Sequence, residues 1–335
     1  MKEASQTIKV WAMTALPLSP FVAAEPRPLD PAKFRDPKLT AKGEARASVP
    51  LHRLETLWFN TGTLCNIACL NCYIESSPRN DALAYLTAAE VEAYLDEIAE
   101  LRLGTREIGF TGGEPFMNRD IAAMVEAALE RGFEALVLTN AMRPMRRFET
   151  PLLTLRERFG ERLTLRVSLD HHTAAVHDAE RGEGGFAKSL DGLRWLAKSG
   201  FRVAVAGRHL PHESEDEARA AFQRLFDLNA VPIDAADPGR LVLFPEMDVR
   251  VDVPEITTAC WSILGKSPAD VMCATSRMVV KRRGAAAPAV ISCTLLPYDA
   301  QFELGPRLAD GLGEVALNHP HCAKFCVLGG ASCSR

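Results

Sequence analysis

Three cysteines lie close together in the segment Cys65-Asn-Ile-Ala-Cys69-Leu-Asn-Cys72. Their C-x3-C-x2-C spacing allows three thiolates to surround one compact inorganic group. Thiolate is the usual ligand of iron–sulfur clusters, and a 4Fe–4S cluster normally takes four, so this loop would leave one iron open to a ligand that is not protein. Zn²⁺ also binds thiolates in tetrahedral geometry, and the triplet by itself leaves a zinc site open as an alternative.

A glycine-rich segment, Gly112-Gly113-Glu114-Pro115, follows an apolar run at 107–110. Glycine has no Cβ atom, so the backbone there can turn tightly and come close to a ligand. Pro115 fixes its own φ angle and stiffens the exit from the turn. A zinc module has no use for such a segment, so the two features together favour an iron–sulfur cluster.

The cysteine triplet and the Gly-Gly-Glu-Pro segment together resemble the radical S-adenosylmethionine (SAM) superfamily, which carries C-x3-C-x2-C after its first strand and GGEP after its second. The resemblance implies a 4Fe–4S cluster held by Cys65, Cys69 and Cys72, with its open iron chelated by SAM. It also implies an electron donor such as flavodoxin or ferredoxin. Reductive cleavage of SAM would then give a 5′-deoxyadenosyl radical that abstracts hydrogen from a substrate.

The resemblance also assigns SAM-binding residues. The Gly-Gly-Glu edge would hydrogen-bond the SAM amino group, an SxD-type strand end would contact its ribose or carboxylate, and an arginine of the type found in peptide-modifying relatives would clamp the carboxylate. Gly112, Gly113 and Glu114 form the glycine edge, Ser168 and Asp170 form the SxD-type strand end, and the arginine is Arg181. Asn140, at the end of the third predicted strand, is a further candidate.

The residues beside the third cysteine differ from those of many family members. Many family members have an aromatic residue just before the third cysteine, whereas this chain has Asn71 there and Tyr73 after it. Adenine stacking at that position is therefore not implied.

Three histidines, His171, His172 and His177, follow the fourth predicted strand. A histidine can transfer protons near neutral pH, but we expect these to lie on the solvated start of a helix.

Strands alternate with helices from residue 54 onward, which predicts an α/β fold with a parallel sheet. Thr87 and Glu90 have the spacing of a capping box at the start of one helix. Six βα units in about 200 residues agree with the partial (β/α)6 barrel that the resemblance implies. The predicted strands are 54–59, 107–110, 135–138, 163–169, 201–206 and 241–244, and the predicted helices are 87–101, 119–131, 186–198 and 213–228.

The chain divides into an irregular, proline-rich segment at 1–50, a radical SAM core at 51–252 and a small cysteine-rich extension at 253–335. The first segment is too irregular to be a compact leader-peptide-binding domain. A net charge of −4 gives no electrostatic reason to expect nucleic acid, and the chain has no apolar run long enough to span a membrane. Nine cysteines in a reducing compartment indicate metal ligation, so we expect a cytoplasmic protein.

The extension contains six cysteines, and four of them suit a second cluster. Cys273 and Cys293 flank two short β-like runs around a turn at Gly284, while Cys322 and Cys326 are one helical turn apart. This resembles the SPASM and twitch extensions, in which a hairpin and a following helix bind auxiliary 4Fe–4S clusters. The run of cysteines typical of a complete SPASM domain is absent, so we expect one auxiliary cluster. The alternatives are a zinc site or no metal in this extension. The two remaining cysteines, Cys260 and Cys333, are candidates to replace one of the four as a ligand.

Three functions agree with these features. The first is oxidative modification of a peptide or protein by a radical SAM oxidoreductase, which the tail cysteines and the Arg181 segment favour. The second is a radical SAM enzyme of small-molecule or cofactor biosynthesis, which the short chain favours. The third is a non-catalytic metal-binding or redox-sensing protein, which would not cleave SAM. The substrate, the reaction after hydrogen abstraction and the oligomeric state leave no signal in the sequence.

Overall fold

The computed structural model describes residues 19–22, 27–245 and 248–332 of the chain. One nine-stranded sheet, in the order β10-β9-β8-β2-β3-β4-β5-β6-β7, organises these residues. All neighbouring pairs from β8 through β2 to β7 are parallel, whereas β8–β9 and β9–β10 are antiparallel. The strands are β2 (Thr56–Asn60), β3 (Glu107–Thr111), β4 (Glu134–Thr139), β5 (Leu163–Ser168), β6 (Arg202–Gly207), β7 (Leu241–Leu243), β8 (Ser276–Val280), β9 (Ala289–Ile291) and β10 (Glu303–Gly305).

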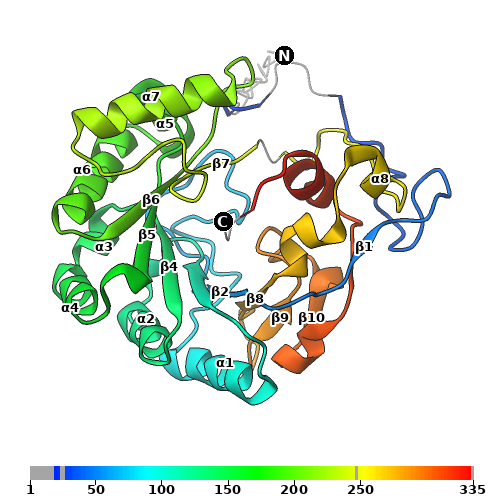
Figure 1. Cartoon of the computed structure of the whole chain (residues 1–335), viewed down its shortest axis with the longest axis horizontal. Helices are drawn as coiled ribbons and strands as arrows, with labels where there is room; N and C mark the ends of the chain where they lie inside the picture. Colours follow the sequence, from blue (N-terminus) through cyan, green and yellow to red (C-terminus); the bar gives the residue numbers. More distant parts are fainter. Residues whose placement is uncertain (1–18, 23–26, 246–247, 333–335) are drawn as a thin grey trace, which may run out of the picture.

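Helices cover the outer face of the curved sheet, and together they form an open partial barrel (Figure 1). Six parallel strands, β2 to β7, confirm the predicted (β/α)6 arrangement. Helices α3, α4, α5 and α8 were not predicted. The helices are α1 (Ala88–Leu101), α2 (Ile121–Glu130), α3 (Arg143–Arg146), α4 (Glu149–Phe159), α5 (Ala174–Arg181), α6 (Gly185–Lys198), α7 (Glu215–Leu228) and α8 (Cys260–Leu264).

Helix α1 shows how local sequence positions an element. The Thr87 side chain accepts a hydrogen bond from the Glu90 amide, and the Glu90 carboxylate accepts one from the Thr87 amide, so the predicted capping box is present. Apolar side chains recur at helical spacing and pack toward the sheet, where the Tyr94 ring lies 6.2 Å from that of Phe59. The buried residues of this helix are Val91, Tyr94, Leu95 and Ile98.

The hairpin of the C-terminal extension continues the sheet of the core. Strand β8 pairs in parallel with β2, whose residues lead into the cysteine loop. The predicted turn at Gly284 has a positive φ of 78°, which glycine adopts without strain. Cys322–Leu328 forms a π-helical segment, and the two-residue strands β1 (Ser48–Val49) and β11 (Val315–Ala316) pair with each other.

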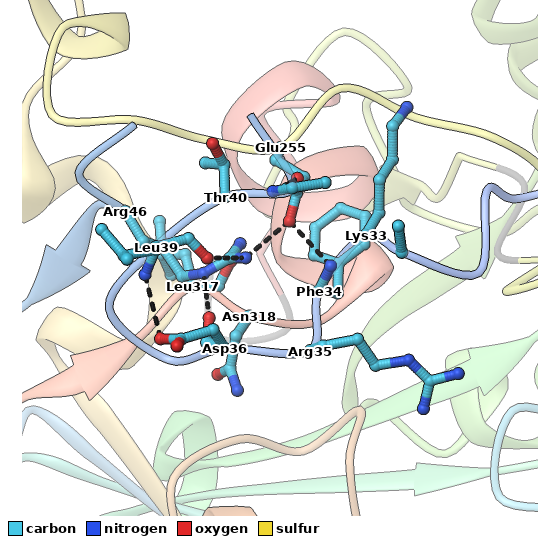
Figure 2. A network of polar contacts seen from close by, with 12 residues as sticks. Lys33, Phe34, Arg35, Asp36, Leu39, Thr40, Arg46, Glu255, Leu317 and Asn318 are labelled. Atoms are coloured by element: carbon cyan, nitrogen blue, oxygen red, sulfur yellow. Dashed lines mark hydrogen bonds and ion pairs between the residues drawn. The ribbon is translucent and has the colours of Figure 1, made fainter. Parts of the chain in front are cut away.

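Residues 27–50 form an N-terminal strap along the C-terminal extension, and Arg46 anchors it (Figure 2). The Arg46 side chain is fully buried and forms an ion pair of 2.5 Å with Glu255. Its guanidinium also donates to the carbonyl oxygens of Asp36, Leu39 and Leu317. The strap and the extension are thus joined by one buried cation.

Glu255 uses both carboxylate oxygens in the same network. Oε1 accepts a hydrogen bond of 2.7 Å from the Phe34 amide, and Oε2 accepts one of 2.6 Å from the Ala41 amide. The segment before the strap lies mostly outside the described residues. Within the part of the chain that the structure describes, no helix has the length and apolar character needed to cross a membrane.

Candidate functional site

The residues predicted from strand ends converge on one cavity at the carboxyl edge of the parallel strands. Its empty space, with the open mouth included, is about 1090 Å³. Among its lining residues are Cys65, Cys69, Cys72, Gly112, Gly113, Asn140, Ser168, Asp170 and Arg181. In the described residues these three cysteines are free thiols.

The two glycines hold the cysteine loop against the end of β3. The Gly113 amide donates to the Gly62 carbonyl at 2.8 Å, and the Glu114 amide donates to the Leu64 carbonyl at 3.0 Å. Gly112 has a φ of 145°, which disfavours any other residue. The glycine-rich segment therefore positions the loop that carries Cys65, in addition to lining the cavity.

Replacement of Gly113 by alanine is expected to separate these two segments. A Cβ atom there would lie 2.2 Å from the Leu64 carbonyl oxygen, so the backbone must move. We expect a loss of about 3 kcal/mol of stability, at the upper end for overpacking, and a lower iron content. Thermal unfolding measures the stability, and iron analysis measures the iron content. The matched control is Gly313→Ala, because Gly313 has a φ of −75° and no heavy atom near the new Cβ. Equal behaviour of the two variants would contradict this role.

Glu114 lies beneath the cavity, where it is 1% exposed. Its carboxylate accepts hydrogen bonds from Thr139 Oγ1 at 2.8 Å, the Asn140 amide at 2.8 Å and the Phe116 amide at 3.2 Å. Burial raises the pKa of Glu114 to about 7, although these three hydrogen bonds act in the opposite direction. Glu114 is absent from the cavity lining, so in this structure it positions the end of β4.

Asn140 connects β4 to the cysteine loop. Its Nδ2 atom donates to Asn66 Oδ1 at 2.9 Å and lies 3.9 Å from Cys65 Sγ. Its carbonyl accepts a hydrogen bond from Ser189 Oγ on α6. Asn140 therefore both lines the cavity and fixes the first cysteine, which agrees with its predicted place in the site.

Arg181, the last residue of α5, forms a bidentate pair with Asp170. Nε and Nη2 lie 2.7 Å and 2.9 Å from the two carboxylate oxygens. Despite its burial, the Arg181 and Arg208 charges hold the pKa of Asp170 below its ordinary value. The Asp170 charge likewise raises the pKa of Arg181, against the effect of burial. Both are charged, and Asp170 orients a cation toward the cavity.

Two site residues were missed by the sequence reasoning. Arg208, just after β6, lines the cavity and lies 3.6 Å from Asp170; its place at a strand end was an available signal. Glu180 is 1% exposed, and its carboxylate accepts a hydrogen bond of 2.9 Å from the Asn71 amide. Its carbonyl accepts one from the Leu70 amide. No sequence signal marks Glu180, because helix α5 was not predicted.

The predicted solvent-exposed placement of the histidines is wrong for two of them. His171 is 3% exposed and His177 is fully buried. Burial lowers the pKa of His177 to about 4, so it is neutral. His172 is partly exposed, and its ring centroid lies 3.9 Å from that of His171. The His171 ring packs near Phe21, with centroids 6.4 Å apart, and the His177 ring packs against Phe186 of α6, with centroids 5.7 Å apart.

The donor set of the cavity fits an iron–sulfur cluster that lacks one protein ligand. Cys65, Cys69 and Cys72 come from one loop and face one space with no fourth cysteine in its lining. Burial raises the pKa of Cys65 to about 12 and that of Cys69 to about 11, so without a metal they are protonated thiols. Metal binding would release these protons.

A second, smaller cavity of about 340 Å³ lies in the C-terminal extension. Its lining brings together Cys273, Cys293, Cys322 and Cys326. Cys260 is not part of this lining, and its Sγ instead lies 3.3 Å from the Thr257 amide. Cys333 lies outside the described residues.

Comparison with known proteins decides the family. The sequence model of the radical SAM superfamily matches residues 59–225, which include the cysteine loop, the glycine-rich segment and Arg181. The chain belongs to the radical SAM superfamily. This family uses a 4Fe–4S cluster and SAM, in agreement with the thiols and the cavity described above.

Relatives of this radical SAM protein include a bacteriocin biosynthesis protein and a maturase. It is 28% identical over 219 residues to the subtilosin biosynthesis protein AlbA of Bacillus subtilis, covering 63% of this chain and 46% of AlbA. It is 30% identical over 161 residues to the mycofactocin maturase MftC of Mycobacterium ulcerans, covering 47% of this chain and 41% of MftC. The chain thus matches less than half the length of either relative.

The fold resembles that of a solved radical SAM protein. Streptococcus suis SuiB bound to SAM superposes with a TM-score of 0.55 at 13% identity, covering 76% of this chain and 63% of SuiB. At that identity the likeness supports the fold alone. The fold of about three quarters of this chain therefore has a structural precedent.

Proposed function

We propose that this protein cleaves SAM reductively and abstracts a hydrogen atom from a peptide or protein substrate, which is thereby oxidatively modified. The observation that carries the proposal is the convergence of three free thiols, a glycine edge and a buried arginine on one cavity. The similarity to AlbA and MftC, a bacteriocin biosynthesis protein and a maturase, favours a peptide substrate, as does a SuiB structure bound to its precursor peptide.

The residues of the cavity have distinct tasks in this proposal. When bound, the 4Fe–4S cluster supplies the electron that breaks the sulfonium carbon–sulfur bond of SAM. Cys65, Cys69 and Cys72 hold that cluster. Arg181, oriented by Asp170, presents a positive charge to the SAM carboxylate.

The glycine edge and the apolar wall complete the site. Gly112 and Gly113 bring the backbone within reach of the SAM amino group. Tyr73, Phe244 and Phe325 also line the cavity, and their rings limit the access of water to a reactive radical. Phe244 and Phe325 pack together with ring centroids 5.4 Å apart, so the extension contributes to the wall.

The second cavity is the proposed site of an auxiliary 4Fe–4S cluster. Its four thiols match the usual ligand number. Two of them, Cys322 and Cys326, lie in a π-helical segment, a rare conformation that is often found at functional sites. The extension would in this way act as a SPASM- or twitch-like domain.

Arg277 supports an anionic group in that second cavity. It is 1% exposed. Burial lowers the pKa of its guanidinium, whereas negative charge at Cys273 and Cys293 acts in the opposite direction. Within the described residues its hydrogen bonds go to carbonyl oxygens, including those of Gly311 and Cys273. Carbonyls carry no formal charge, and a buried cation without a counter-charge is costly. The thiolate ligands of a cluster would supply that counter-charge.

Replacement of Cys273 by alanine is expected to remove one cluster selectively. The iron content should fall from about eight to about four atoms per chain, because one of two cubes loses a ligand, while SAM cleavage persists. Cys260→Ala is the matched control and should keep about eight. Iron and sulfide analysis of anaerobically reconstituted protein measures the difference. A loss of iron in Cys260→Ala, or none in Cys273→Ala, would refute the ligand set.

The proposed function is tested by anaerobic incubation with SAM and dithionite, followed by mass spectrometry. We expect 5′-deoxyadenosine and methionine, and a peptide encoded beside the gene should lose hydrogen atoms. Turnover of a small metabolite in place of any peptide would favour small-molecule biosynthesis. Intact SAM under all reductants would refute enzymatic activity and favour a metal-binding or redox-sensing role. The proposed setting is the cytoplasm, with flavodoxin or ferredoxin as electron donor.

A further inference from the structure

A second group of metal-ligating side chains lies beside the radical SAM cavity but outside its lining. His171 and His172 follow β5, and Glu213 precedes α7. One ligand atom from each side chain lies within 4.8 Å of the other two. These residues are far from both sets of cysteines in the sequence, and the proposed reaction does not use them.

We propose that His171, His172 and Glu213 form a mononuclear site for a divalent transition-metal ion, with zinc as the ion that we test. Two imidazoles and one carboxylate are a ligand set that binds zinc in proteins, with a further position left for water or substrate. The set contains no sulfur, so it differs in chemistry from both cysteine sites.

The distances suit ligands of one ion better than hydrogen bonds. His171 Nε2 lies 3.5 Å from Glu213 Oε2, and His172 Nδ1 lies 3.8 Å from Glu213 Oε1. Hydrogen bonds of this kind are normally about 2.7–3.2 Å long. Two ligands that each lie about 2.1 Å from a tetrahedral zinc ion are about 3.4 Å apart.

The ring nitrogens that face Glu213 are buried and lack a hydrogen-bond partner. These atoms are His171 Nε2 and His172 Nδ1, for which the described residues provide no hydrogen-bond partner. The His171 side chain is 4% exposed, so water cannot readily satisfy it. Buried polar atoms are normally paired, and an orphaned pair aimed at a carboxylate indicates an absent ligand.

Thr173 orients the His171 ring through two contacts with Nδ1, one of which is a hydrogen bond that the Thr173 amide donates. His171 Nδ1 lies 2.8 Å from Thr173 Oγ1 and 3.1 Å from the Thr173 amide. Donation from Nδ1 to the hydroxyl leaves the Nε2 lone pair free for a metal, whereas donation from the amide favours the other tautomer. Histidine ligands generally donate their second N–H in this way, and metal binding would select that tautomer.

The test uses the full-length protein with its clusters reconstituted anaerobically, then treated with zinc chloride and desalted. We expect about one retained zinc per chain, with an X-ray absorption spectrum that shows nitrogen and oxygen ligands at about 2.0–2.1 Å. His172→Gln and Glu213→Gln should each reduce zinc affinity at least about tenfold. The matched control is His212→Gln, because His212 is exposed and lies next to Glu213; it should retain zinc.

Several outcomes would overturn the site. They are no retained zinc in the unaltered chain, zinc with sulfur neighbours at about 2.3 Å, and unchanged zinc affinity in both His172→Gln and Glu213→Gln. Circular dichroism and cluster absorbance confirm that each variant is folded. The readout is metal content and ligand type, so it is independent of SAM cleavage and of the proposed function.

Discussion

Replacing Cys65, Cys69 and Cys72 together by alanine is expected to abolish 5′-deoxyadenosine formation from SAM. Among the described residues that line the first cavity, no other cysteine is present to replace these three thiols as cluster ligands. The iron content should fall from about eight to about four atoms per chain. The remaining iron should be bound by the second cavity and be visible in anaerobic electron paramagnetic resonance spectra.

Cys273→Ala provides the reciprocal control for the triple variant. Each variant should keep one cluster and lose the other, so the two spectra should add up to that of the unaltered protein. Formation of 5′-deoxyadenosine by the triple variant would refute the assignment of the SAM site. Zinc in place of iron at the first three cysteines would do the same.

The replacement Asp170→Ala is expected to produce the largest loss of stability among single substitutions at the site. Arg181 would lose both oxygens of its bidentate partner while remaining buried. Breaking a buried ion pair by removing one member costs about 3–5 kcal/mol, which lowers the thermal midpoint by roughly 4–7 °C. SAM affinity should also fall, because the arginine loses its orientation.

An exposed ion pair supplies the control for Asp170. Asp81 and Arg283 lie 2.9 Å apart, but their side chains are 50% and 72% exposed. Asp81→Ala should therefore cost less than about 1 kcal/mol and leave SAM binding unchanged. Calorimetry of the reconstituted proteins measures both effects. Similar midpoints for Asp170→Ala and the unaltered protein would show that the buried pair contributes no net stability.

The sequence was most informative where periodicity and strand ends coincide. Residues that follow β2, β3, β4 and β5 were predicted to meet, and they do, because parallel strands place their carboxyl ends at one edge of a sheet. The capping box at Thr87 and the hairpin around Gly284 were also recognisable, since each depends on a local backbone requirement. These features need no knowledge of distant contacts.

The remaining parts depend on tertiary packing that leaves no local signal. Glu114 was predicted to bind SAM, and no local pattern indicated that its carboxylate would accept hydrogen bonds from Thr139 and the Asn140 amide. His171 and His177 were predicted to be solvated, yet both are buried, with Phe21 and Phe186 as ring neighbours. The pairing of β8 with β2 joins positions more than 200 residues apart, and no periodicity of 3.6 or 2 residues encodes it.

The pairing of β8 with β2 has a consequence for self-association. Strand β2 would be the outer strand of the six-stranded parallel sheet, with a row of free amides and carbonyls that invites pairing with another molecule. The hairpin β8–β9 covers that row, and β10 at the new margin has only three residues. The cysteine-rich extension therefore also protects the catalytic sheet from aggregation.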